Sequence, residues 1–321
     1  MTSDPPRRPF GAFPLLVYDL SIWKRYLLAM LVPDAVRLPL VPGESKDDIL
    51  RRIPEDFTGT FAFHINVTDA SNCPHDRAGL VEALHGRGIR TLNAKIIDIS
   101  KRFVQATCHR AGLMTTSAPR LGDPSEVLIV KTNRNYGGKP ETHAPADVRK
   151  VLAFSEHVVH AAGDHGYLVA ARRDIPSESW EDPNYVVERY IENAQHLFYR
   201  IYVFCDRIAV SEGIHDALVK AIRHSQRQRL VLFTVEDERV HTSIPAEIPS
   251  DLQPLVDATI RFTRLAQIDF GCLDVMRDEQ GRFYIVDVNT TASWGPETEF
   301  RIIEYLSPNG RAPGSGVAAA S

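Results

Sequence analysis

Short apolar runs alternate along the chain with longer stretches in which apolar residues recur at helical spacing. The runs over residues 15–18, 60–65 and 127–131 have the length and apolar content of buried strands. Residues 22–31 and 147–162 show the spacing of helices instead. This alternation predicts an α/β or α+β fold rather than an all-helical or all-strand architecture.

The order of these elements divides the chain into four predicted segments. The first is a small N-terminal open-sheet domain, which begins with a tail rich in proline and arginine over residues 1–13. A subdomain with a lysine-bearing helix and a glycine loop follows, then a strand-rich subdomain that ends in a hairpin, and finally a C-terminal tail. These segments cover residues 1–92, 93–190, 191–306 and 307–321, respectively.

The composition indicates a globular protein without a strongly charged surface. Of the 321 residues, 44% are hydrophobic, and 37 lysines and arginines against 41 aspartates and glutamates give a net charge of -4. No long block of one charge sign occurs, so we expect neither a nucleic acid nor a membrane as a partner. No apolar run has the length of a signal peptide core or a bilayer span, which predicts a cytoplasmic protein with reduced cysteines.

The strongest chemical pattern is the predicted hairpin over residues 271–289. Because side chains alternate along a strand, Phe283, Ile285, Asp287 and Asn289 are expected to share one face. Folding the hairpin about its polar turn places Asp274 opposite position 285, give or take a residue, and so near Asp287. The oxygens of two carboxylates and an amide are suitable ligands for Mg²⁺, and the phosphates of a bound nucleotide would complete its coordination shell. The alternative is that these are ordinary polar residues of an edge strand facing water.

Two lysines and a glycine loop lie upstream of this hairpin. Lys131 ends an apolar strand and leads into a loop with Gly137 and Gly138, where exposed backbone N–H groups suit phosphate oxygens. Lys101 lies in the first turn of a predicted helix, from which it can reach across a cleft. Neither a Walker A loop nor a dinucleotide fingerprint is present. Taken singly, each lysine is also consistent with a solvated charge, and the two glycines with a plain turn.

In this order and spacing, the lysines, the glycine loop and the acidic hairpin resemble the ATP-grasp superfamily over residues 60–305. The resemblance is nearest to the ribosomal-protein glutamate ligase and glutathione synthetase branches. It implies an ATP-grasp fold with a small N-terminal domain, and ATP and two Mg²⁺ ions as cofactors.

The resemblance also implies roles for individual residues. The implied metal ligands are Asp274, Asp287 and Asn289, and the implied catalytic arginines are Arg200 and Arg223. The backbone of residues 188–191 would hold the adenine edge. The implied nucleotide-binding residues are Lys101, Lys131, Gly137, Gly138, Glu188, Arg189, Tyr190, Ile191 and Glu192.

The chain departs from the pattern of these relatives at several positions. Phe198 stands where relatives often carry an acid that binds the ribose, so that role falls to Glu192 or is lost. Asp287 replaces the usual glutamate, and the loop holds only two glycines. Residues 211–228 lack an Arg-x-Asn pattern, and Arg223 is one of the nearest cationic substitutes.

The resemblance implies that ATP activates a carboxylate as an acylphosphate, which an amine then converts to an amide. Two alternatives stay open, namely a small-molecule kinase on the same fold and a nucleotide-binding regulatory module without turnover. We expect the substrate to be a small molecule or a peptide, and the family resemblance suggests a homodimer.

Overall fold

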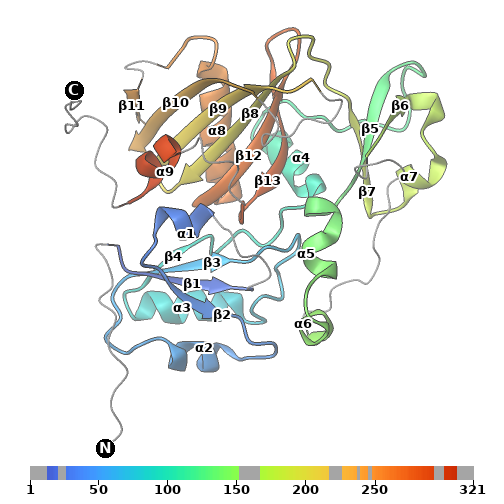
Figure 1. Ribbon diagram of the computed structural model, residues 1–321. Coiled ribbons are helices and arrows are strands. Elements are labelled where there is room, and N and C mark those ends of the chain that lie inside the picture. The colour runs from blue at the N-terminus through green and yellow to red at the C-terminus, as the bar shows by residue number, and fades with distance from the viewer. Residues whose placement is uncertain are drawn as a thin grey trace, which may run out of the picture.

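The computed structural model describes residues 13–20, 27–151, 167–216, 226–236, 239–244, 248–292 and 300–308 (Figure 1). Its strands form three separate sheets of four, three and six strands. Helices pack on these sheets, so the predicted α/β (α+β) class is confirmed. Whether the three sheets belong to separate folding units stays a prediction.

The N-terminal sheet is parallel throughout, with strand order β2-β1-β3-β4. Its strands are β1 (Leu15–Asp19), β2 (Val36–Pro39), β3 (Thr60–His64) and β4 (Arg90–Leu92). Helices α2 (Lys46–Arg52) and α3 (Arg77–Gly86) bury apolar side chains against one face. The other face packs on α1 (Leu27–Leu31), on α9 (Phe300–Leu306) and on the largest sheet. The predicted helix over residues 22–31 is therefore present where it is described, while residues 21–26 lie outside the described part.

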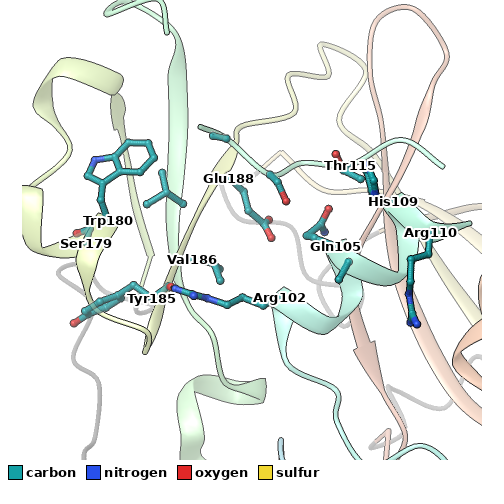
Figure 2. A pocket seen from close by; sticks show the side chains of 14 residues that line it. Arg102, Gln105, His109, Arg110, Thr115, Ser179, Trp180, Tyr185, Val186 and Glu188 are labelled. Atoms are coloured by element: carbon teal, nitrogen blue, oxygen red, sulfur yellow. The ribbon is translucent and has the colours of Figure 1, made fainter. Parts of the chain in front are cut away.

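The smallest sheet is antiparallel and has the order β6-β5-β7. Its strands are β5 (Val127–Thr132), β6 (Tyr167–Ala171) and β7 (Tyr185–Arg189). Helix α4 (Lys101–Arg110) faces β7, and Figure 2 shows Arg102 of α4 extending toward Tyr185. Ser100 caps α4 by accepting a hydrogen bond from the Phe103 N–H, as its residue type predicts.

Short helical turns connect the strands of this sheet. They are η1 (Asn135–Gly138), α5 (Lys139–Thr142), α6 (Ala146–Val151), η2 (Arg172–Asp174) and α7 (Ser177–Glu181). Of the helix predicted over residues 147–162, α6 covers the described part, and residues 152–166 lie outside it. Strand β6 has no counterpart among the predicted elements.

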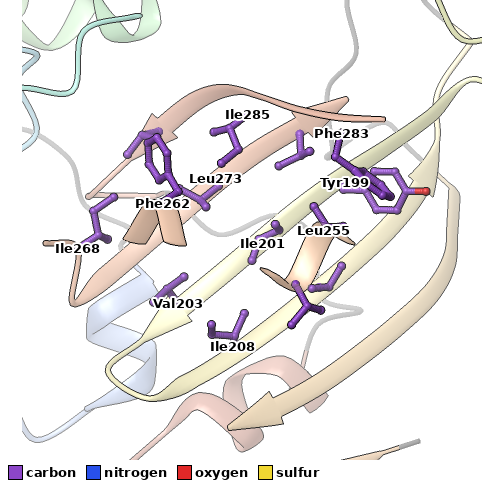
Figure 3. Packing of buried hydrophobic residues seen from close by; sticks show 14 of the residues in the cluster. Tyr199, Ile201, Val203, Ile208, Leu255, Phe262, Ile268, Leu273, Phe283 and Ile285 are labelled. Atoms are coloured by element: carbon purple, nitrogen blue, oxygen red, sulfur yellow. The ribbon is translucent and has the colours of Figure 1, made fainter. Parts of the chain in front are cut away.

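The largest sheet is antiparallel, with the order β11-β10-β9-β8-β12-β13. Its strands are β8 (Leu197–Phe204), β9 (Arg207–Ile214), β10 (Gln226–Glu236), β11 (Arg239–Ile244), β12 (Phe270–Arg277) and β13 (Phe283–Asn289). Helix α8 (Gln253–Ala266) and α4 bury their apolar sides against one face. Figure 3 shows this core, in which Leu255 and Phe262 of α8 meet Ile201, Leu273 and Ile285 of the strands.

A β-bulge in the predicted hairpin corrects the expected alternation of side chains. Asp274 pairs with Asp287, but the next residue, Val275, pairs with Ile285, so Val286 is the extra residue. As a result Ile285 and Val288 both enter the core under α8, although an odd and an even position should point to opposite faces. The expectation that Phe283, Ile285, Asp287 and Asn289 share one face is therefore wrong.

Among the described residues, no helix combines the length and the apolar content that a membrane crossing requires.

Candidate functional site

A cavity of about 110 Å³ lies between the smallest and the largest sheet. Strands β5, β6, β7, β8, β12 and β13 and the start of α4 contribute its walls. The side chains that line it are Lys101, Thr116, Ile129, Lys131, Tyr167, Glu188, Arg189, Tyr190, Ile191, Phe198, Asp274, Met276, Val286 and Asp287. The cavity brings both predicted lysines, Lys101 and Lys131, together with both predicted acids, Asp274 and Asp287.

The two acids lie directly opposite each other on neighbouring strands, with Asp274 on β12 and Asp287 on β13. Arg200 on β8 lies opposite Asp274 on its other side. The Arg200 Nε and Nη2 atoms donate to the two carboxylate oxygens of Asp274 at 2.7 and 3.0 Å. Burial raises the pKa of the Asp274 carboxyl and the charge of Asp287 adds to this effect, while Arg200 lowers it. The alternative of edge-strand acids facing open water does not fit this geometry.

Lys101 approaches the acidic pair from the first turn of α4. Its Nζ atom lies 3.7 Å from the Asp287 carboxylate and donates to the backbone oxygen of Arg134 at 3.2 Å. The residue is 3% exposed, which rules out a solvated helix charge. Because Ser100 caps α4, the helix begins at Lys101, and this start fixes where the lysine side chain enters the cavity.

Lys131 lies near the end of β5 and forms an ion pair with Glu188 of β7. The Lys131 Nζ and Glu188 carboxylate are 2.5 Å apart, and both side chains are buried. Positions 129 and 188 are paired in the sheet, so the two charged side chains are diagonal neighbours on one face. A solvated charge at a strand end is therefore excluded for Lys131 as well.

The predicted adenine hinge has most of its backbone donors already in use. The Arg189 N–H donates to the Thr116 backbone oxygen at 2.6 Å, and the Tyr190 N–H donates to the Val127 backbone oxygen at 3.2 Å. Ile191 follows the strand and lines the cavity, and its N–H makes no hydrogen bond with the described residues. Glu192 is exposed and is not among the lining residues, so it does not face the cavity.

The glycine loop lies beside the cavity but does not line it. Gly137 and Gly138 have φ angles of 66° and 79°, a backbone conformation that residues other than glycine rarely adopt. The Asn135 N–H donates to the Thr68 hydroxyl at 2.9 Å, which fixes the start of the loop to the segment that follows β3. The predicted contact of these glycines with a nucleotide stays a prediction.

Asn289 is placed less favourably for a metal than the two acids. It shares a face with Asp287, since its partner Cys272 is two residues from Asp274. However, its Oδ1 atom accepts a hydrogen bond from the Thr291 N–H at 2.9 Å, and it does not line the cavity. In the described part of the chain, no group of three or more histidine, cysteine and acidic side chains could hold a metal. Oxygens of a bound phosphate would have to complete a magnesium shell around Asp274 and Asp287.

Several lining residues were missed because single-sequence patterns do not reveal them. Thr116 is 1% exposed, and its hydroxyl has no partner among the described residues. Tyr167 lies on the unpredicted strand β6, and burial together with Asp287 raises its pKa to about 12. Ile129, Met276 and Val286 form an apolar side of the cavity. In the sequence they look like any other apolar strand residues.

Arg223, the second predicted catalytic arginine, lies outside the described residues. Arg200 is described, and its side chain reaches the acidic pair through Asp274. Because Arg200 does not itself line the cavity, contact with a transferred phosphoryl group stays a prediction.

No protein-family model matches the chain, and no curated protein matches it. Its structure is similar to solved structures of ligases, as the sequence resemblance predicted. One is the ATP-grasp ligase PsnB complexed with a minimal precursor, with a TM-score of 0.47, 13% identity, and coverage of 94% of this chain and 96% of that one. Another is D-alanine–D-alanine ligase from Bacillus anthracis complexed with ATP, with a TM-score of 0.48, 14% identity, and coverage of 92% and 94%.

An L-amino acid ligase from Bacillus licheniformis is similar as well, with a TM-score of 0.44 and 12% identity. That likeness covers 87% of this chain and 67% of the other. At these scores and identities the likenesses decide neither substrate nor chemistry, so function has to be inferred from the site itself.

Proposed function

We propose that this cavity binds ATP with Mg²⁺, and that the protein uses ATP to activate a carboxylate for attack by an amine. The observation that carries the proposal is the convergence of Asp274 and Asp287 with Lys101 and Lys131 on one cavity. Opposed acids repel each other in a partly buried sheet, and a divalent cation between them removes that repulsion. Buried lysines beside them supply the positive charge that a triphosphate requires.

The walls of the cavity match the two ends of a nucleotide. Ile129, Met276 and Val286 provide an apolar surface for a base, and Phe198 extends it. The Ile191 N–H has no partner among the described residues, and it would donate to the edge of the base. Lys101 and Lys131 lie on the charged side and would hold the phosphates. Lys131 would then exchange part of its contact with Glu188 for a phosphate oxygen.

The acids fit magnesium through their chemistry and their positions. Carboxylate oxygens are hard ligands, and the strand register places Asp274 and Asp287 face to face. Magnesium bound there would neutralise the charge that develops on the phosphates during transfer. Arg200 orients the Asp274 carboxylate by two hydrogen bonds and lowers its pKa against the larger effect of burial. We propose two Mg²⁺ ions, with Asn289 as a further ligand once its oxygen turns from Thr291.

The proposed reaction has two steps. A carboxylate oxygen of the acceptor attacks the γ-phosphorus, ADP leaves, and an acylphosphate forms. An amine then attacks the acyl carbon, inorganic phosphate leaves, and the amine nitrogen loses a proton. The protein contributes positioning and charge neutralisation, which are the main catalytic terms in phosphoryl transfer. We propose a small molecule or a peptide as the acceptor.

Incubation of the purified protein with Mg-ATP and pooled amino acids, peptides and carboxylates tests this function. Free phosphate together with a condensed product supports the ligase. A product that gains one phosphoryl mass, without free phosphate, would identify a kinase instead. Tight nucleotide binding with no turnover for any acceptor would favour a regulatory module. Asp287→Ala should abolish ATP turnover, whereas Asp257→Asn, at an exposed position on α8, should not change it.

A further inference from the structure

A second and larger cavity, of about 580 Å³, adjoins the proposed nucleotide site at Glu188. Figure 2 shows it between α4 on one side and β7 and α7 on the other. Glu188 lines both cavities. The volume falls in the range of small-molecule sites, which are typically about 300–1,000 Å³.

The wall formed by α4 is positively charged. Arg102, Ala106, His109 and Arg110 recur at helical spacing and are exposed along one stripe of the helix, while Lys101 enters the nucleotide cavity. Neither Arg102 nor Arg110 forms an ion pair with a described residue. The Arg102 Nη2 atom donates to the Tyr185 backbone oxygen at 2.9 Å, which directs this guanidinium across the cavity. Its other side-chain N–H groups have no partner among the described residues.

No other charge in the lining offsets these two arginines. Glu188 is the one acid among the described lining residues, and its carboxylate is already paired with Lys131. The side chains that line the second cavity therefore carry an excess of positive charge on the α4 wall, which favours an anionic group close to Arg102, whereas Asp182 and Glu178 lie near Tyr185 on the other wall.

The opposite wall is aromatic and apolar. Trp180 and Tyr185 are half-buried, and Figure 2 shows both rings on the side of the cavity away from α4. With Val187 and Ala118, they pack on the small core formed by Leu128, Val130 and Ile175. Both side chains line the cavity, where a planar ring can stack or pack edge-on against them.

The backbone of β7 does not favour an extended peptide as the occupant. Its Tyr185 oxygen accepts from Arg102, and its Val187 oxygen accepts from the Ala118 N–H at 3.3 Å. A peptide strand could not pair with these carbonyls without breaking both bonds. A compact ligand that contacts side chains on both walls fits the cavity better.

The geometry points to a second ligand site, separate from the nucleotide cavity, for a small molecule that joins an aromatic ring to a carboxylate or a phosphate. The ring packs on Trp180 and Tyr185, and the anionic group binds Arg102. Arg110, two helical turns further along α4, adds positive potential rather than a direct contact with the same group.

Isothermal titration of the full chain with four probes tests this site. Phenyl phosphate and phenylacetate carry both features, inorganic phosphate carries only the charge, and benzyl alcohol carries only the ring. At least one of the first two should bind at one molecule per chain, and whichever binds more tightly identifies the anionic group. The two single-feature probes should bind at least tenfold more weakly. The proposal is overturned if neither aromatic anion binds, or if a single-feature probe binds equally well.

Variants locate the binding and separate it from the nucleotide site. Arg102→Gln should weaken binding about tenfold, since a hydrogen bond to a charged group is lost. Trp180→Leu should weaken binding too, whereas Arg301→Gln, at an exposed position on α9, is the matched control and should leave it unchanged. Asp287→Asn, which removes a proposed magnesium ligand from the nucleotide cavity, should leave probe binding unchanged. Weaker probe binding to Asp287→Asn, or unchanged binding to Arg102→Gln, would overturn the site, whereas failure of a non-hydrolysable ATP analogue to bind the wild type would count only against the proposed ATP site.

Discussion

Asp274 lies directly opposite Asp287 in the antiparallel pair of β12 and β13, and the bulge at Val286 follows immediately. Each acid has a basic neighbour, Arg200 for Asp274 and Lys101 for Asp287. The extra residue in the strand lets Val288 and Ile285 enter the core while Asp287 stays in the cavity. The bulge thus lets β13 place apolar side chains in the core while Asp287 stays beside Asp274 in the cavity.

Lys131→Gln should weaken binding of an ATP analogue about 100-fold, because a charged phosphate contact is lost. Glu188→Gln should not weaken it, because the lysine is then released from its ion pair and stays available to the phosphate. Calorimetric titration of both variants measures the difference. Equal losses in the two variants would mean that the intact ion pair, rather than the lysine alone, supports the site.

Arg200→Ala should destabilise the fold by about 3 kcal/mol, because it leaves a mostly buried carboxylate on Asp274 without its cation. Adding Asp274→Asn should recover much of this loss. Urea unfolding without nucleotide measures both effects. Arg120→Ala, which breaks the exposed pair with Glu181, is the control and should leave stability nearly unchanged. A double variant as unstable as Arg200→Ala alone would show that the guanidinium acts through packing instead.

Sequence patterns predicted most of the strands that form the proposed site, because apolar runs and polar turns are local signals. The closeness of Asp274 and Asp287 followed from hairpin folding, but the expected register was wrong: Asp274 lies opposite position 287 rather than 285, give or take a residue. The turn shifts the pairing by one residue from the expected register, and the bulge shifts it by one more. The bulge was missed because Val286 is an ordinary strand residue, and nothing local distinguishes it from its neighbours. The Lys131–Glu188 pair was missed because 57 positions separate its members, and only the pairing of β5 with β7 brings them together.

Asn93→Ala should destabilise the protein by about 2–4 kcal/mol, because it leaves buried backbone groups without partners. The Asn93 side chain accepts from the N–H groups of Asp269 and Phe270 and donates to the Phe270 oxygen, which ties β4 to β12. Its backbone has a φ of 52°. Asn93→Gly keeps that backbone conformation accessible, so its loss of folding stability should be about 1 kcal/mol smaller than that of Asn93→Ala. Chemical denaturation measures these stabilities, and a lower free energy of unfolding for the glycine variant than for the alanine variant would contradict this explanation.

Thiols in the folded protein should react slowly with a disulfide reagent at pH 8. Burial raises the pKa of Cys73, Cys108 and Cys205 to about 12, so these groups stay protonated at that pH. Only the thiolate is a nucleophile. In guanidinium chloride all four cysteines should react rapidly. Fast reaction of Cys73 in the native protein would show that it is not buried as described.

Affinity for a non-hydrolysable ATP analogue, measured with and without Mg²⁺ in the wild-type protein and in Asp287→Asn, tests most directly whether the two acids hold a metal–nucleotide complex. Mg²⁺ should tighten binding to the wild type by tenfold or more, since it removes the repulsion between acids and phosphates. In Asp287→Asn this gain should largely disappear, and metal-free binding should be as tight as in the wild type or tighter. An equal gain from Mg²⁺ in both proteins would contradict the proposed role of the acidic pair.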